Sequence, residues 1–197
     1  HTPWEWHEKL FAHAADRGIS IFSSPFDFSA VALLQDLGAP AFKIASFEAI
    51  DLPLIRYVAS KGKPMIISTG MANLQEIQEA VAAAIDGGCE DLALLLCVSG
   101  YPAPPSDYNL ATLTDMISRF DVPIGLSDHT LDNTTAIASV ALGASIIEKH
   151  ITLDRTGGGP DDSFSLEPKE FAALCRDAKT AWTALGRVAY GGKSSER

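Results

Sequence analysis

The feature that most constrains the fold is a regular alternation of short apolar runs with longer amphipathic segments along the 197-residue chain. The apolar runs show little polar alternation, which is typical of strands covered on both faces, as in a parallel sheet flanked by helices. The chain is therefore predicted to be an α/β protein made of βα units. We expect strands at 19–22, 41–44, 64–68, 92–97, 123–125 and 145–149.

Helices are predicted between and after these strands. In one of the amphipathic segments Leu74, Ile77 and Val81 recur at helical spacing, Asn73 is suited to cap the amino end, and two glycines follow the last turn. The other segments have the same character. The predicted helices are 29–37, 54–60, 73–86, 110–120, 134–142 and 168–185.

Polar residues at the strand ends favour one of two possible architectures. Serial βα units form either an open, doubly wound sheet or a (β/α)8 barrel, the TIM barrel. Nearly every predicted strand ends in hydroxyl, acidic or basic residues, and only a barrel converges all strand ends on one central mouth. No GxGxxG motif follows any strand to mark a dinucleotide site. We therefore predict most of a TIM barrel.

Charge and composition exclude several classes of partner. The net charge is −10 and no block of Lys or Arg occurs, which argues against nucleic acid or anionic lipid as a partner. The apolar runs fall short of the ~20 residues that cross a bilayer, so no membrane association is expected. Cys89, Cys97 and Cys175 form no CxxC pair, and reduced, mostly buried thiols suit a cytoplasmic enzyme.

Two histidines at the ends of consecutive predicted strands form a candidate metal site. His129 and His150 would face the same mouth of a barrel, and two neutral imidazoles there can hold one divalent ion, leaving positions for water or substrate. The alternative is that each histidine only hydrogen-bonds a neighbouring loop. Two protein ligands are too few for a closed structural zinc site.

A lysine and several hydroxyls at the strand ends form a candidate anion site. Lys43, and equally Lys149, can pair with a carboxylate or phosphate. The alternative is a lysine that fills the barrel and pairs with Glu148 or Glu48. The supporting hydroxyls would be those of Ser24, Ser46, Ser68, Thr69 and Ser127.

Three acids and one tyrosine are candidates for substrate contacts. Glu48, Asp128 and Asp161 are placed to bind sugar hydroxyls or move protons, although Asp128 is better suited to orient His129. Tyr101 begins a stiff loop and either faces a ligand or packs. The glycine-rich segment 156–165 is either a mobile loop over the site or a surface turn.

Seven sequence motifs, in order along almost the whole chain, resemble the sialic acid synthase family. They are FSSPFD (22–27), KIASFE (43–48), PMIISTGM (64–71), YPAP (101–104), GLSDHT (125–130), EKHITL (148–153) and GGPDDSFSLEP (158–168). The opening TPWEWH and the later FSLEP are most similar to the pseudaminic acid synthases of that family. The N-acetylneuraminate and legionaminate synthases are the alternatives.

The resemblance implies a carbon–carbon bond-forming transferase. Phosphoenolpyruvate would condense with an open-chain N-acetylated amino sugar, 2,4-diacetamido-2,4,6-trideoxy-L-altrose, to give a nonulosonic acid (pseudaminic acid) and phosphate. By motif, His129 and His150 would bind a divalent metal, Mn2+ with Mg2+ or Co2+ as alternatives. Lys43, Ser46, Ser24, Ser68 and Ser127 would bind phosphoenolpyruvate, and Glu48, Tyr101 and Asp161 would contact the sugar in the catalytic site.

The chain also departs from the family pattern. Family members begin with two further strands that carry a catalytic Glu, a substrate-binding Lys and a Gln, and end with an antifreeze-like domain that donates an Arg across a homodimer. We therefore expect 1–190 to be a partial barrel domain and 191–197 the start of a linker. Such a fragment would expose sheet edges and be inactive alone.

Two other readings remain. One is a non-catalytic barrel remnant that binds a metal or an anion, or serves only as a structural unit. The other is a related phosphoenolpyruvate aldolase-type enzyme with a phosphorylated acceptor, against which the lack of an Arg cluster counts.

Overall fold

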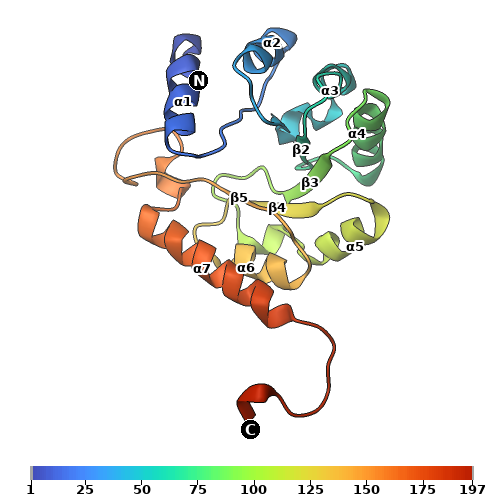
Figure 1. Ribbon diagram of the computed structural model, residues 1–197, viewed down its shortest axis with the longest axis vertical. Helices are drawn as coiled ribbons and strands as arrows, with labels where there is room; N and C mark the ends of the chain where they lie inside the picture. Colours follow the sequence, from blue (N-terminus) through green and yellow to red (C-terminus); the bar gives the residue numbers. More distant parts are fainter. Residues whose placement is uncertain (1, 197) are drawn as a thin grey trace.

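Five parallel strands form one curled sheet in chain order (Figure 1). The computed structural model describes residues 2–196. Because each strand pairs in parallel with the next one along the chain, every connection crosses over through a helix, as βα units require. The strands are β1 (Phe42–Ile44), β2 (Met65–Ser68), β3 (Leu92–Cys97), β4 (Ile124–Asp128) and β5 (Ile147–Lys149).

All six predicted helices are present, with ends shifted by two residues or fewer. The helix α1 was not predicted; none of its residues is fully buried, and its Phe11 packs against the core from the edge. Short 3-10 turns lie at Trp4–Trp6, Ser46–Ile50, Pro105–Asp107, Asp162–Phe164 and Ser194–Glu196. The α-helices are α1 (His7–Asp16), α2 (Phe28–Asp36), α3 (Leu52–Ala59), α4 (Leu74–Asp86), α5 (Ala111–Arg119), α6 (Thr134–Ala141) and α7 (Pro168–Leu185).

Side-chain caps fix where the helices of the first half begin. The Asn73 side chain accepts from the Glu76 amide and Glu76 returns a bond to the Asn73 amide, which completes a capping box on α4. The Asp27 and Asp51 side chains cap α2 and α3 by accepting from the Ala30 and Leu54 amides, without a reciprocal bond. The predicted cap of α4 is confirmed.

The first predicted strand, 19–22, is wrong. The only pairing there is an isolated parallel bridge between Ser23 and Phe42, and the Lys43 amide donates to the Ser23 carbonyl. Ile19 is 65% exposed, so its side chain does not pack against the sheet. An apolar run becomes a strand only where a neighbour supplies a ladder of hydrogen bonds and cross-strand packing. The segment beside β1 forms a single bridge, between Ser23 and Phe42, which is too little for a strand.

The strand β4 extends further than its apolar run. We predicted 123–125, whereas the strand continues through the polar residues Ser127 and Asp128. Ser127 is in register with Cys97 of β3, and Asp128 with Lys149 of β5. The polar end of β4 is part of the strand because β3 and β5 both pair with it.

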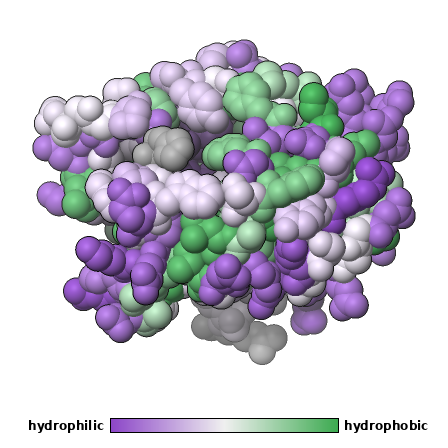
Figure 2. Space-filling model, turned by 90° about the horizontal axis from the view of Figure 1, so that it is seen from above, coloured by the Kyte–Doolittle hydropathy of each residue, from purple (hydrophilic) through white to green (hydrophobic). Residues whose placement is uncertain are grey.

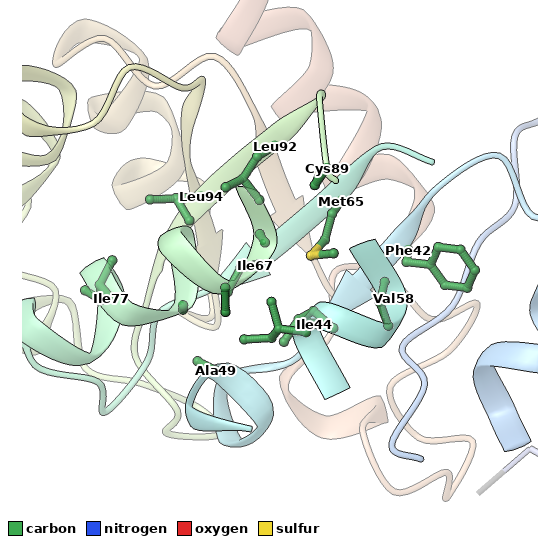
Figure 3. Packing of buried hydrophobic residues seen from close by; sticks show 14 of the residues in the cluster. Phe42, Ile44, Ala49, Val58, Met65, Ile67, Ile77, Cys89, Leu92 and Leu94 are labelled. Atoms are coloured by element: carbon green, nitrogen blue, oxygen red, sulfur yellow. The ribbon is translucent and has the colours of Figure 1, made fainter. Parts of the chain in front are cut away.

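The hydrophobic core lies between one face of the sheet and the helices that cover it. Figure 3 shows Ile44, Ile67 and Leu94 from β1, β2 and β3 packed near Val58 of α3 and Ile77 of α4. The exposed fraction of each of the three strand side chains is 1% or less. Residues of a strand alternate between its faces, so the intervening positions face the concave side of the sheet.

Apolar side chains also reach the surface. Figure 2 shows apolar patches between hydrophilic ones on the face seen from above. Phe26 and Trp6 are 64% and 57% exposed. Within 2–196, no helix combines the length and the apolarity needed to cross a bilayer.

Candidate functional site

A cavity of about 380 Å³ lies at the carboxyl ends of the strands. It is where βα folds place their ligand sites, because the loops after the strands meet there. Most of the predicted site residues line it, whereas Glu48, Thr69, Asp128 and Asp161 do not. The Thr69 hydroxyl donates to the Leu95 carbonyl instead. The lining side chains come from Ser24, Lys43, Ala45, Ser46, Ser68, Cys97, Tyr101, Ser127, His129, Glu148, Lys149 and His150.

The alternation of side chains along β4 and β5 decides which residues face this cavity. Leu126 packs in the core, whereas Ser127 lines the cavity in register with Glu148. One residue further, Asp128 and Lys149 pair with each other. His129 and His150 follow and return to the cavity.

The two predicted metal ligands lie side by side. The ring centroids of His129 and His150 are 5.2 Å apart. The Nδ1 atom of His129 lies 2.7 Å from the Val98 carbonyl, so this nitrogen carries the proton and Nε2 keeps its lone pair. Nε2 in turn lies 3.4 Å from the Ser127 hydroxyl. The imidazole is therefore held in the tautomer that a metal ligand needs.

Burial keeps both imidazoles neutral. It lowers the pKa of His129 below its ordinary value, although the bond to the Val98 carbonyl opposes this. It also lowers the pKa of His150, and the neighbouring His129 lowers it further. The Nδ1 atom of His150 lies 3.6 Å from Asp161 Oδ2. Neutral rings are the form that binds metals.

Aromatic rings form one wall around the imidazoles. The Tyr101 ring centroid lies 4.3 Å from that of His129 and 5.8 Å from that of His150. Phe164 packs against Tyr101 and His150 from the loop after β5. Burial raises the pKa of the Tyr101 hydroxyl. Tyr101 is nevertheless 48% exposed, so it can both pack and meet a ligand.

The buried ammonium of Lys43 organises the opposite side of the cavity. Its Nζ donates to Ser68 Oγ at 2.8 Å and to the Ile44 carbonyl at 3.0 Å. Glu148 Oε2 lies 3.7 Å away. Burial lowers the pKa of Lys43, and the Glu148 charge opposes that effect. The pairing with Glu148 that we had weighed as an alternative is thus present, within the same cavity.

Glu148 is a cavity residue that we considered only as a partner of a lysine. Its Oε1 accepts from Ser127 Oγ at 2.6 Å, so it joins β5 to the hydroxyl on β4. The signal was available, because Glu148 stands two residues before His150 and must share its face of the strand. Cys97 was also missed as a lining residue, and its Sγ accepts from Ser46 Oγ at 3.3 Å.

The expected roles of Asp128 and Lys149 are wrong. Asp128 makes no hydrogen bond to the His129 ring, which contacts the Val98 carbonyl and the Ser127 hydroxyl, and the Lys149 ammonium is bonded within the protein. Although Lys149 borders the cavity, its Nζ donates to Asp128 Oδ2 at 2.8 Å, and these side chains are 2% and 0% exposed. The two residues stand one position before the histidines, on the other face, and so meet each other.

Two predicted sugar contacts lie outside the cavity wall. Asp161 lies near the cavity because its Oδ2 atom is 3.6 Å from His150 Nδ1, and its side chain is 59% exposed. Glu48 lies in the turn after β1, where its buried Oε2 has no hydrogen-bond partner in the described chain. Burial raises the pKa of Glu48. Both therefore border the site without lining it.

The donor set fits an open metal site. The described residues contain no cluster of three or more His, Cys, Asp or Glu side chains arranged around one ion. Two imidazoles with free nitrogens leave most coordination positions to water or substrate oxygens, as catalytic metals require. The candidate ligands remain His129 and His150.

Comparison with known proteins gives a consistent result over nearly the whole chain. The model of the NeuB family matches residues 1–190. The N,N'-diacetyllegionaminic acid synthase of Campylobacter jejuni is 42% identical over 182 residues, which cover 91% of this chain and 54% of that protein. The pseudaminic acid synthase of Helicobacter pylori is 42% identical over 185 residues, or 94% and 54%. The chain spans about half the length of these relatives.

A solved structure has the same fold. The N-acetylneuraminic acid synthetase of Leptospira borgpetersenii, crystallised with citrate, superimposes with a TM-score of 0.93 at 34% identity. The match covers 100% of this chain and 68% of that one. The arrangement of helices and strands is therefore shared with a protein that carries that name.

Proposed function

Because this chain belongs to the NeuB family, we propose that it forms the central part of a synthase that condenses phosphoenolpyruvate with an N-acetylated amino sugar. One observation carries the proposal: a buried lysine with four serines and a pair of neutral imidazoles lines a single cavity at the strand ends. The first set suits a phosphorylated acid and the second suits a metal. We also propose that the five curled strands are part of an eight-stranded barrel.

Lys43 and the hydroxyls would bind the enol substrate. The Lys43 ammonium is already hydrogen-bonded to Ser68, so it needs little reordering to meet a phosphate or carboxylate. Ser24, Ser46 and Ser127 line the same cavity and would supply further donors. The Glu148 carboxylate now lies close to Lys43 and Ser127, so an incoming anion must compete with it.

His129 and His150 would hold a divalent cation, proposed to be Mn2+ with Mg2+ or Co2+ as alternatives. When bound, such an ion supplies a Lewis acid for the sugar aldehyde. The protein's part is to keep both rings neutral and His129 in one tautomer, through burial and the Val98 carbonyl. Tyr101 and Asp161, beside these rings, would contact the sugar, as would Glu48 from the turn after β1.

The proposed reaction forms one carbon–carbon bond and one carbon–oxygen bond to water, and breaks the carbon–oxygen bond to phosphate. C3 of phosphoenolpyruvate attacks the aldehyde carbon, and the oxygen of water adds at C2 while one of its protons makes the aldehyde oxygen a hydroxyl. The resulting tetrahedral carbon expels phosphate, which takes the second proton of the water, and leaves a keto acid. Lys43 would balance the phosphate charge during this loss, which is the electrostatic stabilisation expected of a preorganised cation.

The acceptor sugar is proposed to be 2,4-diacetamido-2,4,6-trideoxy-L-altrose, which would make pseudaminic acid the product. The motifs TPWEWH and FSLEP support it. The relatives do not discriminate, because synthases of legionaminic and pseudaminic acid are equally similar at 42% identity.

The test is release of phosphate from phosphoenolpyruvate with Mn2+ and a panel of acetamido sugars, using the full-length protein. Release only with the altrose sugar supports the proposal in full. Release with a different acetamido sugar corrects the acceptor, and release with a phosphorylated sugar alone indicates an aldolase-type enzyme. If the full-length protein releases no phosphate with any sugar, the proposal is overturned and the hypothesis of a non-catalytic barrel remains.

A further inference from the structure

We propose that the buried ion pair between Asp128 and Lys149 is a positioning device that sets the separation of the two imidazoles. The two residues directly precede His129 and His150 and are in register with each other across β4 and β5. The inference rests on the proposed metal site. It assigns a function to two residues that contact neither metal nor substrate.

The geometry ties the ends of the two strands together at one point. Lys149 Nζ donates to Asp128 Oδ2 at 2.8 Å, and the Asp128 Oδ1 atom accepts from the Thr130 amide at 2.9 Å. The ammonium also donates to the Thr130 and Asp132 carbonyls at 2.6 and 2.8 Å. One lysine therefore holds the last residue of β4 and the loop after it against β5.

The position of the pair links it to the imidazoles. Because successive residues of a strand point to opposite faces, the two side chains meet each other at the edge of the cavity, which Lys149 also borders, while the next residue on each strand enters the cavity. A change in the spacing at Asp128 and Lys149 is passed through one peptide unit to both rings. The His129 ring and amide have their own partners in Val98 and Tyr108, whereas the only polar partner of the His150 ring is Asp161 in the described chain.

Energetics argue that the pair is more than a stabilising contact. Two charges removed from water lose their hydration, and their mutual attraction often does no more than offset that loss. Apolar or neutral replacement of both partners is therefore often tolerated, whereas removal of one partner is not. Because the attraction within such a pair only offsets its lost hydration, its place directly before two candidate ligands fits a role in geometry.

The decisive variant is the double change Asp128→Asn with Lys149→Met, which removes both charges. We expect it to fold with a lowered Tm, because the Thr130 and Asp132 carbonyls lose their donor. At temperatures where it is folded it should bind Mn2+ about 10- to 100-fold more weakly by titration calorimetry, as loss of a residue that orients a ligand typically does. Asp115→Asn is the control, because it breaks an exposed pair with Arg119 away from the cavity and should leave Mn2+ binding unchanged.

A metal-free measurement keeps this inference separate from the proposed function. In long-range ¹H–¹⁵N spectra, the imidazole signals of both His129 and His150 should broaden or double in the double variant, and not in Asp115→Asn. Unchanged signals together with unchanged Mn2+ affinity would overturn the positioning role while leaving the metal site intact. If the unchanged protein binds no Mn2+, the metal site fails and the imidazole signals alone decide.

A purely structural role predicts a different pattern. The double variant would then lose Tm and keep its Mn2+ affinity at temperatures where it is folded. Asp128→Glu supplies a further check, because it keeps the charge and lengthens the side chain by one methylene. We expect Asp128→Glu to bind Mn2+ more tightly than the double variant, although more weakly than the unchanged protein. An affinity no higher than that of the double variant would count against a positioning role that depends on the ion pair.

Discussion

The two faces of the five-stranded sheet differ in what their residues do. On the face toward the helices, Ile44, Ile67, Leu94 and Leu126 are almost completely buried in one apolar core. On the concave face the corresponding neighbours include Lys43, Ser68 and Ser127, which hydrogen-bond one another or Glu148. Adjacent residues of one strand therefore have different roles: one packs in the core and stabilises the fold, and the next faces the candidate site. Substitutions at two adjacent positions compare these roles directly.

The largest expected effect is on the helix face. Leu126→Ala removes a fully buried side chain, and we expect the free energy of unfolding to fall by about 2–5 kcal/mol, because the transfer free energy is lost and a cavity remains. Urea denaturation measures it. Mn2+ and phosphoenolpyruvate affinity of the folded fraction should be retained. If Leu126→Ala lowered the free energy of unfolding by less than Ser127→Ala does, the helix face would not be the one that stabilises the fold.

Next in size is the removal of an imidazole. His129→Ala should weaken Mn2+ binding at least about 100-fold, above the usual cost of losing a residue that only orients a ligand. Titration calorimetry measures this affinity. His13→Ala, which removes an exposed histidine of α1, is the matched control. Equal affinities in His129→Ala, His150→Ala and the control would refute the metal site.

Loss of the buried ammonium should affect anion binding. Lys43→Met removes a charge-assisted interaction worth about 1.5–3 kcal/mol, so phosphoenolpyruvate should bind about 10- to 100-fold more weakly. The measurement is calorimetry with phosphoenolpyruvate alone. Lys61→Met, which changes a half-buried lysine stacked on Tyr57 outside the cavity, controls for net charge. Similar weakening in both variants would indicate bulk electrostatics instead of a local site.

The same lysine predicts a pH dependence. Burial lowers the pKa of Lys43 below its ordinary value of 10.5, so the ammonium loses its proton at a lower pH than a free lysine does. Phosphoenolpyruvate affinity should therefore fall as the pH rises toward that value, in a range where a phosphate monoester no longer titrates. Lys43→Arg should abolish the decline, because arginine stays charged. A decline that persists in Lys43→Arg would mean that another group titrates.

The smallest effect is expected for the hydroxyl next to Leu126. Ser127→Ala removes the bond to Glu148, whose side chain is 40% exposed and can be hydrated instead. We expect a change of about 0.5–1.5 kcal/mol in the free energy of unfolding. Phosphoenolpyruvate affinity should change by less than in Lys43→Met. A destabilisation as large as that of Leu126→Ala would show that the concave face also carries the fold.

Local sequence signals were sufficient for most of the architecture. Apolar runs marked β1 to β5, and apolar spacing with cap residues marked α2 to α7, because both signals are read from neighbours along the chain. The run at 19–22 looked the same and failed, since Ile19 and Phe22 have no ladder to join. The helix α1 was missed, and it packs on the core only through partly buried side chains such as Phe11.

The sequence by itself determined which residues stand at the strand ends, and hence that Lys43, the serines and the two histidines are candidates for one site. Only the tertiary structure decided which partners each of two similar lysines has. Lys43 and Lys149 both stand at strand ends and line the cavity, yet the Lys149 ammonium is bonded to Asp128 and two loop carbonyls, whereas the Lys43 ammonium is bonded to Ser68. The physical reason is that strand register and the side-chain face, both set by pairing between distant segments, fix where a charge points.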